Sequence, residues 1–593
     1  MHIYWNCREL GTLSMFLGEE ADVFGYFRGV IIDSIAKSLG VEHGKEELLT
    51  GVVVGPPTQA KHGDMYTNAA MILGKKERKN PMDVAKTLCD IFGDIPGIES
   101  VNVVPPGFIN FICTKTVWHS VIKKINQFKE DFGRVDIGGG EKVNVEFVSA
   151  NPTGPLHVGH ARGAVLGDVL SNLLEWVGYK VTREYYVNDA GSQIKTLVSS
   201  VYLRYLEVLG DDIVMEEGLY PGEYLKDVAR SLVDKYGDTL RFMDNRDDVI
   251  RELTLNSMLE SIREDLALMG VSHDVYVSER KLQDDNVVEE CVEYLKERGV
   301  VCRGMLERPK WLEDDVEWEQ REQLIFRSKD FGDDCNRALQ KEDGSWTYFA
   351  GDIAYHFNKI SRGFNRMVLV LGYDHKGYVA RIKAIVKALS GGKAQIDVKL
   401  CNLVNFLENG AQVKMSKRKG DFLAVRDVVE EVGSDVTRFM LLTRKNDAVM
   451  NFDFAKACEE SKDNQIFYIQ YAHARVRSVV RSHTKLLPIE EVDFSFLSSD
   501  QEMSLAKLLA KWPSVVKYSA ETHEPHGIAF YLIEVAEAFH MLWGCGVKNS
   551  DMRFIVEGDE QTTSARLYLA IATSLVISAG LAIFSIVPME EMR

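Results

Sequence analysis

The sequence predicts a multidomain α/β protein whose doubly wound, Rossmann-like catalytic domain is split by an insertion. Residues 142–186 alternate strand, glycine-rich turn, helix and strand, which is typical of the first half of such a fold. The apolar run at residues 367–372 has the composition of a buried parallel strand, so the fold resumes there. Between them lies a helical, acidic region. A chain of 593 residues also has room for further domains.

A small α+β domain is predicted at residues 22–115, preceded by an extension at residues 1–21. Residues 22–39 have helical periodicity. The two apolar runs within residues 101–112 predict a hairpin, because Pro105-Pro106-Gly107 separates them as a turn.

The catalytic domain is predicted in two halves, at residues 116–195 and 331–446, with the insertion at residues 196–330. Three consecutive glycines at 138–140 predict a flexible joint near its start. After Asp447 the pattern is helical throughout, so residues 447–593 are predicted to form an all-α bundle.

Composition limits the possible functions. The net charge of −18 excludes a basic coat for nucleic acid, so any RNA must bind through local basic patches. None of the nine cysteines has CxxC spacing, which favours a reducing cytoplasm and no zinc site. The uncharged stretch from Leu567 to Pro588 is long enough to cross a bilayer. Its serines, threonines and glycine favour the core helix of a bundle instead, so no membrane partner is expected.

Two short motifs carry the chemistry. Pro155-Leu156-His157-Val158-Gly159-His160 follows a predicted strand and opens a helical pattern, and Lys414-Met415-Ser416-Lys417 lies far downstream. Both motifs in this order would occur by chance in about one chain in ten thousand.

Together the motifs predict a site that holds ATP and stabilises its α-phosphate while pyrophosphate leaves. His157 and His160 can donate hydrogen bonds to phosphate oxygens at a helix N-terminus, where backbone N–H groups already favour anions. Gly159 lets adenine approach the backbone. Lys414 and Lys417 are point charges suited to the β- and γ-phosphates, and Mg²⁺ accompanies the nucleotide. A metal pair is the alternative for the histidines, but no acid or cysteine nearby in sequence supplies a third ligand.

The two motifs resemble the signatures of class I aminoacyl-tRNA synthetases. Residues 145–156 (VEFVSANPTGPL), 185–191 (YYVNDAG) and 348–356 (YFAGDIAYH) resemble the arginyl-tRNA synthetases of bacterial type. The resemblance extends from about Asp22 to the C-terminus. Arg418 replaces the serine that usually follows the second motif, and Gly154 stands where some arginyl enzymes carry a lysine.

The resemblance implies a residue set for each ligand. The catalytic residues would be His157, His160, Lys414 and Lys417, and Pro155, Gly159 and Met415 would join them in binding ATP. Arginine would be bound by Glu146, Ser149, Asn151, Asp189, Tyr348, Asp352 and His375. Acids suit this substrate because a planar guanidinium pairs with carboxylates.

The resemblance also implies tRNA(Arg) as a partner, bound by the N-terminal domain and the C-terminal bundle of a monomer. Phe108 and Asn110 would contact the tRNA elbow, and Tyr471 and Arg475 would lie in the anticodon-binding bundle. Basic residues up to Arg481, with aromatic neighbours such as Trp512, strengthen the prediction of RNA contact.

Three alternatives are weaker. A lysyl or cysteinyl synthetase shares the motifs, but the cysteine enzyme needs zinc-binding cysteines. A small HxGH nucleotidyltransferase would be far shorter and would lack the helical C-terminal domain. A catalytically inactive RNA-binding or membrane-anchored relative would not need all four motif residues.

Overall fold

The computed structural model describes residues 22–40, 50–57, 59–307, 321–412, 423–459, 461, 464–483 and 485–592. The chain forms two compact units. One comprises the described residues of 1–135, 460–523 and 527–593, and the other those of 136–459 and 524–526.

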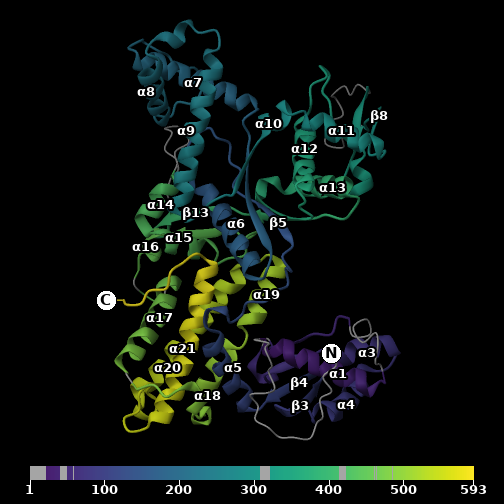
Figure 1. The fold of residues 1–593 in the computed structure, drawn as a ribbon, viewed down its shortest axis with the longest axis vertical. Coiled ribbons are helices and arrows are strands. Elements are labelled where there is room, and N and C mark those ends of the chain that lie inside the picture. The colour runs from purple at the N-terminus through teal and green to yellow at the C-terminus, as the bar shows by residue number, and fades with distance from the viewer. Residues whose placement is uncertain are drawn as a thin grey trace. The chain divides into compact units, whose positions relative to one another are not determined.

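The second unit is built on a five-stranded, all-parallel sheet of order β12-β11-β5-β6-β7 (Figure 1). Its strands are β5 (Lys142–Glu146), β6 (Lys180–Val187), β7 (Val275–Ser278), β11 (Arg366–Gly372) and β12 (Gln395–Cys401). Helices α6 (Val158–Trp176), α12 (Tyr348–Ser361) and α13 (Val379–Ser390) connect or cover them. The predicted doubly wound fold is confirmed, and its strand order reverses between β5 and β11, where such sheets bind ligands.

The range predicted as one insertion contains β7, so the sheet is interrupted twice. The first insertion holds α7 (Ser192–Val208), α8 (Tyr224–Tyr236) and α9 (Arg246–Leu268), which share a core. The second holds α10 (Glu279–Asp284), α11 (Val287–Glu297) and an antiparallel sheet of β8 (Val301–Met305), β9 (Glu322–Phe326) and β10 (Arg337–Ala338). β7 was not predicted because its apolar run, Val275-Tyr276-Val277, is only three residues long.

The glycines at 138–140 do not form a flexible joint. Gly138 N–H donates to Val177 O and Gly140 N–H to Gly178 O, each at 2.9 Å. A Cβ on Gly138 would lie 2.4 Å from Tyr179 N. Gly138 is therefore required for close packing of backbone on backbone.

The end of the second unit packs against α6. It holds β13 (Val404–Glu408), β14 (Ala411–Gln412), β15 (Met450–Asp453), α14 (Val425–Val432), α15 (Ser434–Leu441) and α16 (Phe454–Ala457). The buried Arg162 of α6 donates to five carbonyl oxygens of this region, which fixes the region to α6.

The first unit begins with α1 (Val23–Ser38), α3 (Ala69–Glu77), α4 (Pro81–Phe92) and a sheet of order β1-β2-β4-β3. These strands are β1 (Val54–Gly55), β2 (Met65–Thr67), β3 (Ile98–Val104) and β4 (Phe108–Cys113). β3 and β4 pair antiparallel across the proline–glycine turn, so the predicted hairpin is confirmed.

Helices make up the rest of the first unit: α5 (Lys115–Phe128), α17 (Gln465–Ser482), α18 (Asp500–Leu509), α19 (Trp512–Thr522), α20 (His526–Lys548) and α21 (Glu560–Ile583). α20 and α21 are long and apolar enough to cross a membrane by composition alone, which is weak evidence. The most apolar window of α21 is 72% buried in the bundle, as a core helix requires. Trp512 is fully buried and donates to Phe132 O, so it is not available to RNA.

Candidate active site

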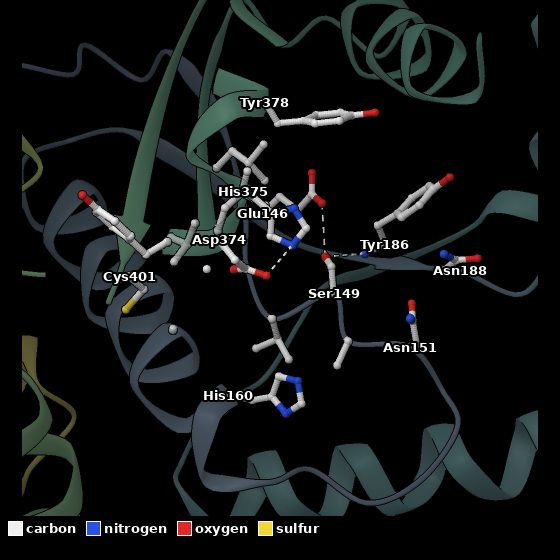
Figure 2. A pocket seen from close by; sticks show the side chains of 18 of the residues that line it. Glu146, Ser149, Asn151, His160, Tyr186, Asn188, Asp374, His375, Tyr378 and Cys401 are labelled. Atoms are coloured by element: carbon white, nitrogen blue, oxygen red, sulfur yellow. Dashed lines mark hydrogen bonds and ion pairs between the residues drawn. The ribbon is translucent and has the colours of Figure 1, made fainter. Parts of the chain in front are cut away.

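A cavity of about 1120 Å³ opens at the carboxyl ends of β5, β6 and β11. It is lined by the first signature and by most of the predicted arginine-binding residues, together with Tyr186, Asn188 and Tyr378. Figure 2 shows His160 on one side of this space, and Tyr378 and Tyr186 on the other. A cavity of this size can hold a nucleotide beside an amino acid.

The histidine side of the cavity is built by the N-terminus of α6. His157 is the N-cap, and its Nδ1 accepts from Gly159 N–H at 3.0 Å. The rings of His157 and His160 lie 3.9 Å apart. A Cβ on Gly159 would lie 2.7 Å from the His157 ring, so glycine is needed here for the cap itself.

Both imidazoles are held neutral. Burial lowers the pKa of His157, and burial together with the neighbouring His157 lowers the pKa of His160 to about 4. The buried Nδ1 of His160 has no hydrogen-bond partner among the described residues. A neutral ring with an unsatisfied nitrogen beside a helix N-terminus is suited to a phosphate oxygen.

The second signature, with Lys414, Met415 and Lys417, lies outside the described residues, which resume at Leu423. Val158 N–H donates to Leu423 O at 3.1 Å, and Val425 N–H donates to Leu156 O at 3.0 Å. The chain that follows the second signature therefore pairs with the first. Pro155 does not line the cavity.

The turn after β5 has an unusual backbone. Val148 and Ser149 have φ of 67° and 43°, a region that β-branched residues avoid. Ser149 Oγ donates to Glu146 at 3.1 Å and accepts from Tyr186 N–H at 3.1 Å (Figure 2). These bonds hold the turn in place. Asn151 donates to Gln193 at 2.8 Å and also lines the cavity.

Glu146 already has a cation. The buried Lys359 ammonium lies 2.5 Å from its Oε2. Lys359 also faces Glu184, which accepts from Tyr355 at 2.7 Å and pairs with Arg362 at 2.6 Å. The network holds two acids and two bases and is therefore close to neutral.

Asp352 has no such cation. Its nearest partner is the Tyr378 hydroxyl, which donates to Oδ2 at 3.1 Å, and no salt bridge reaches it among the described residues. Burial raises the pKa of Asp352 to about 7; the Tyr378 hydrogen bond and the charge of Arg381 oppose this, and the neighbouring Glu279 and Glu146 raise it further. The Asp352 carboxyl, with its acidic neighbours, is suited to a cationic ligand.

Glu279, at the start of α10, was not singled out from the sequence; it is buried and does not line the cavity. Burial and the charge of Asp189 raise the pKa of its carboxyl, which is hydrogen-bonded by Tyr186. Its only sequence signal was its place directly after β7, a strand too short to be recognised.

The other predicted arginine-binding residues divide into two groups. Tyr348, 65% exposed, and His375 line the cavity from α12 and from the 3₁₀ turn Tyr373–Tyr378. Asp189 does not line it: its carboxylate accepts from Ser278 Oγ at 2.6 Å and from Arg280 N–H at 2.9 Å. Asp189 therefore anchors the start of α10.

The predicted tRNA-binding residues lie on the first unit. Phe108 stacks edge-on against Tyr66, and Asn110 is buried in β4. Arg475 lies over the rings of Tyr471 and Trp543, and donates to Tyr471 Oη at 2.7 Å.

Not all of the predicted basic face is open to RNA. Arg477 and Arg481 pair with Glu590 and Glu591 of the C-terminal segment.

Across the described ranges, no group of three or more histidines, cysteines or acids could hold a metal ion. The eight cysteines of those ranges are free.

A parallel sheet whose first strand is followed by an HxGH-capped helix is typical of the catalytic domain of class I aminoacyl-tRNA synthetases. The family model "tRNA synthetases class I (R), catalytic domain" matches residues 124–478. "Arginyl tRNA synthetase N terminal domain" matches residues 28–113, and "DALR anticodon binding domain" matches residues 469–592.

Individual relatives agree. An arginine–tRNA ligase of Anaplasma phagocytophilum is 65% identical over 96% of this chain and 99% of its own. The ligase of Wolbachia pipientis wMel is 57% identical over 91% and 94%. The crystal structure of a putative arginyl-tRNA synthetase from Campylobacter jejuni has a TM-score of 0.70 at 30% identity, covering 81% of this chain and 100% of that one. The chain belongs to the arginyl-tRNA synthetase family, of the bacterial type that its sequence predicted.

Proposed function

We propose that this protein attaches L-arginine to tRNA(Arg) through an arginyl-adenylate, with release of pyrophosphate and AMP. One observation carries the proposal. A single cavity joins a neutral histidine pair at a helix N-terminus to a carboxyl group, Asp352, that forms no ion pair with any described residue. Such a cavity suits a polyanion at one end and a cation at the other.

ATP binds with its phosphates at the start of α6. His157 and His160 donate to phosphate oxygens, and their alignment of the α-phosphate with the arginine carboxylate provides most of the rate. Lys414 and Lys417 supply positive charge to the leaving pyrophosphate, and Met415 contributes to the same ATP site. Mg²⁺ arrives on the ATP phosphates, because the described residues offer it no carboxylate cluster. Zinc has no role.

Arginine binds with its guanidinium against Asp352, beside Tyr348. A carboxylate can accept two parallel N–H bonds from the planar group, and lysine cannot reproduce that geometry. Ser149, Asn151 and His375 lie along the rest of the amino acid. Glu146 acts indirectly, since Lys359 and Ser149 already use its two oxygens.

The first unit binds the tRNA. Arg475 and Tyr471 present a cation and a ring to anticodon bases, and Phe108 and Asn110 contact the elbow. The protein acts as a monomer in the cytoplasm.

Pyrophosphate exchange into ATP, measured with each amino acid and with or without tRNA(Arg), tests the proposal. Exchange with arginine alone among the amino acids is expected, and tRNA should be required. Exchange driven by lysine would overturn the substrate, and no exchange with any amino acid would overturn the activity.

A further inference from the structure

Tyr224, at the start of α8 in the first insertion, contacts the loop that carries the ATP-site histidines. Its hydroxyl donates to Thr153 O at 2.6 Å. A Cβ on Gly154 would lie 2.9 Å from that hydroxyl and 3.1 Å from the ring. Position 154 therefore has no room for a side chain while Tyr224 is in place, and the lysine of some arginyl enzymes does not fit here.

Asp265, on α9 of the same insertion, joins this loop to a second segment. It is 2% exposed. Its Oδ2 accepts from Leu156 N–H at 3.2 Å, and its Oδ1 accepts from Arg426 Nε and Nη2 at 3.3 and 3.2 Å. One buried carboxylate thus binds the first signature and the start of α14.

The two segments that Asp265 joins are also paired with each other. The backbone bonds between Leu156 and Val425 and between Val158 and Leu423 enclose an antiparallel bridge from His157 to Ala424. A shift in the register of these two paired segments would displace His157, the N-cap of α6. Two backbone hydrogen bonds alone stabilise the register only weakly.

We propose that Asp265 is a positioning residue for the nucleotide: it holds the His157 segment in register with residues 423–426, with Tyr224 supporting the same loop. The first insertion is then a buttress of the ATP site. A displacement of about 1 Å in an aligned reaction can lower the rate roughly 100-fold. The inference rests on the proposed activation of arginine by ATP.

The test compares Asp265→Asn and Tyr224→Phe with matched controls on the same helices. Asp247→Asn changes an exposed aspartate of α9, and Tyr236→Phe changes a tyrosine of α8 whose hydroxyl forms no hydrogen bond with the described residues. The full-length protein is used throughout. Pyrophosphate exchange gives kcat and the KM values for ATP and arginine, and amide hydrogen exchange is followed at Leu156, Val158 and Val425.

For Asp265→Asn we expect kcat to fall at least tenfold, the KM for arginine to stay within twofold, and the Leu156 and Val425 amides to exchange faster. Tyr224→Phe should show the same pattern with a smaller fall. An unchanged kcat, or a rise in arginine KM parallel to the fall in kcat, would overturn the positioning role. The amide measurement needs no substrate. Unchanged hydrogen exchange at Val425 would therefore overturn the positioning role of Asp265 even if the proposed activity fails.

Discussion

Glu146 and Asp352 are carboxylates on the same cavity, but the protein supplies a close cation to only one of them. Glu146 is paired with Lys359 at 2.5 Å, inside a network that also contains Glu184 and Arg362. Asp352 has a tyrosine hydroxyl and a raised pKa instead. A carboxylate with an internal counter-ion stabilises the fold, and we propose that the one without an ion pair, Asp352, binds the cationic substrate.

The same comparison separates an effect on folding stability from an effect on ligand binding. Glu146 and Lys359 lose their hydrating water together when the chain folds. Asp352 stays partly protonated near neutral pH, because its charge is disfavoured until a cation arrives. Changes to the Glu146 network should therefore lower stability, and changes near Asp352 should affect arginine binding.

The largest expected effect is on stability, in Lys359→Met. Removal of one partner leaves Glu146 and Glu184 buried with too little positive charge, and such a loss destabilises by about 3–5 kcal/mol. Urea unfolding measures it. Lys383→Met, on the exposed face of α13, is the control and should change the free energy of unfolding by less than about 0.5 kcal/mol. If both variants are equally stable, the charge of Lys359 does not stabilise the fold through the Glu146 network.

Lys359 could not be predicted from the sequence. The histidine pair, Glu146 and Asp352 were recognised because each stands in a short motif. Lys359 lies 213 residues from its partner Glu146, so only the parallel pairing of β5 and β11 and the packing of α12 bring them together.

The errors have the same origin. Strands β5 and β11 were predicted because they are apolar and buried, whereas β7 is half-buried and was placed inside an insertion. Without β7, Glu279 had no predicted position. Asp189 was grouped with the arginine-binding residues by its motif, and that role stays a prediction; its carboxylate accepts from Ser278 Oγ, a contact between two strands that no local pattern encodes.

The second effect is on substrate binding, in Asp352→Asn. Loss of a charge-assisted pair with the guanidinium corresponds to about 1.5–3 kcal/mol, so the KM for arginine should rise about 10- to 100-fold with the KM for ATP unchanged. Glu146→Gln is the matched comparison, and should raise the KM for arginine less than tenfold while lowering stability. The reverse order of the two arginine KM values would show that Glu146, rather than Asp352, binds the guanidinium.

The third effect is a pH dependence. The pKa of Asp352 is raised from 3.8 to about 7, so the carboxyl loses its charge as the pH falls through 7. Calorimetric titration should show arginine binding weaken about tenfold from pH 8 to pH 6. For stability the sign is opposite: the folded protein binds the extra proton between pH 4 and 7, so this group makes the protein less stable as the pH rises across that range. In Asp352→Asn the binding profile should be flatter, and an equally steep profile would assign the titration to another group.

The smallest effect isolates the tyrosine beside Asp352. The Tyr378 hydroxyl lowers the pKa of that carboxyl by donating to its charged form, so Tyr378→Phe should move the midpoint of the arginine-binding profile to higher pH. A hydrogen bond of this kind corresponds to about 1 kcal/mol, and at pH 7 the dissociation constant should rise about threefold. At pH 9 the two proteins should converge, because the carboxylate is then ionised in both. Tyr373→Phe changes another tyrosine of the cavity that does not touch Asp352, and should leave the profile in place. If the threefold rise in the dissociation constant persists at pH 9, Tyr378 contacts arginine directly. The effect of Tyr378 on binding would then not act through Asp352 alone.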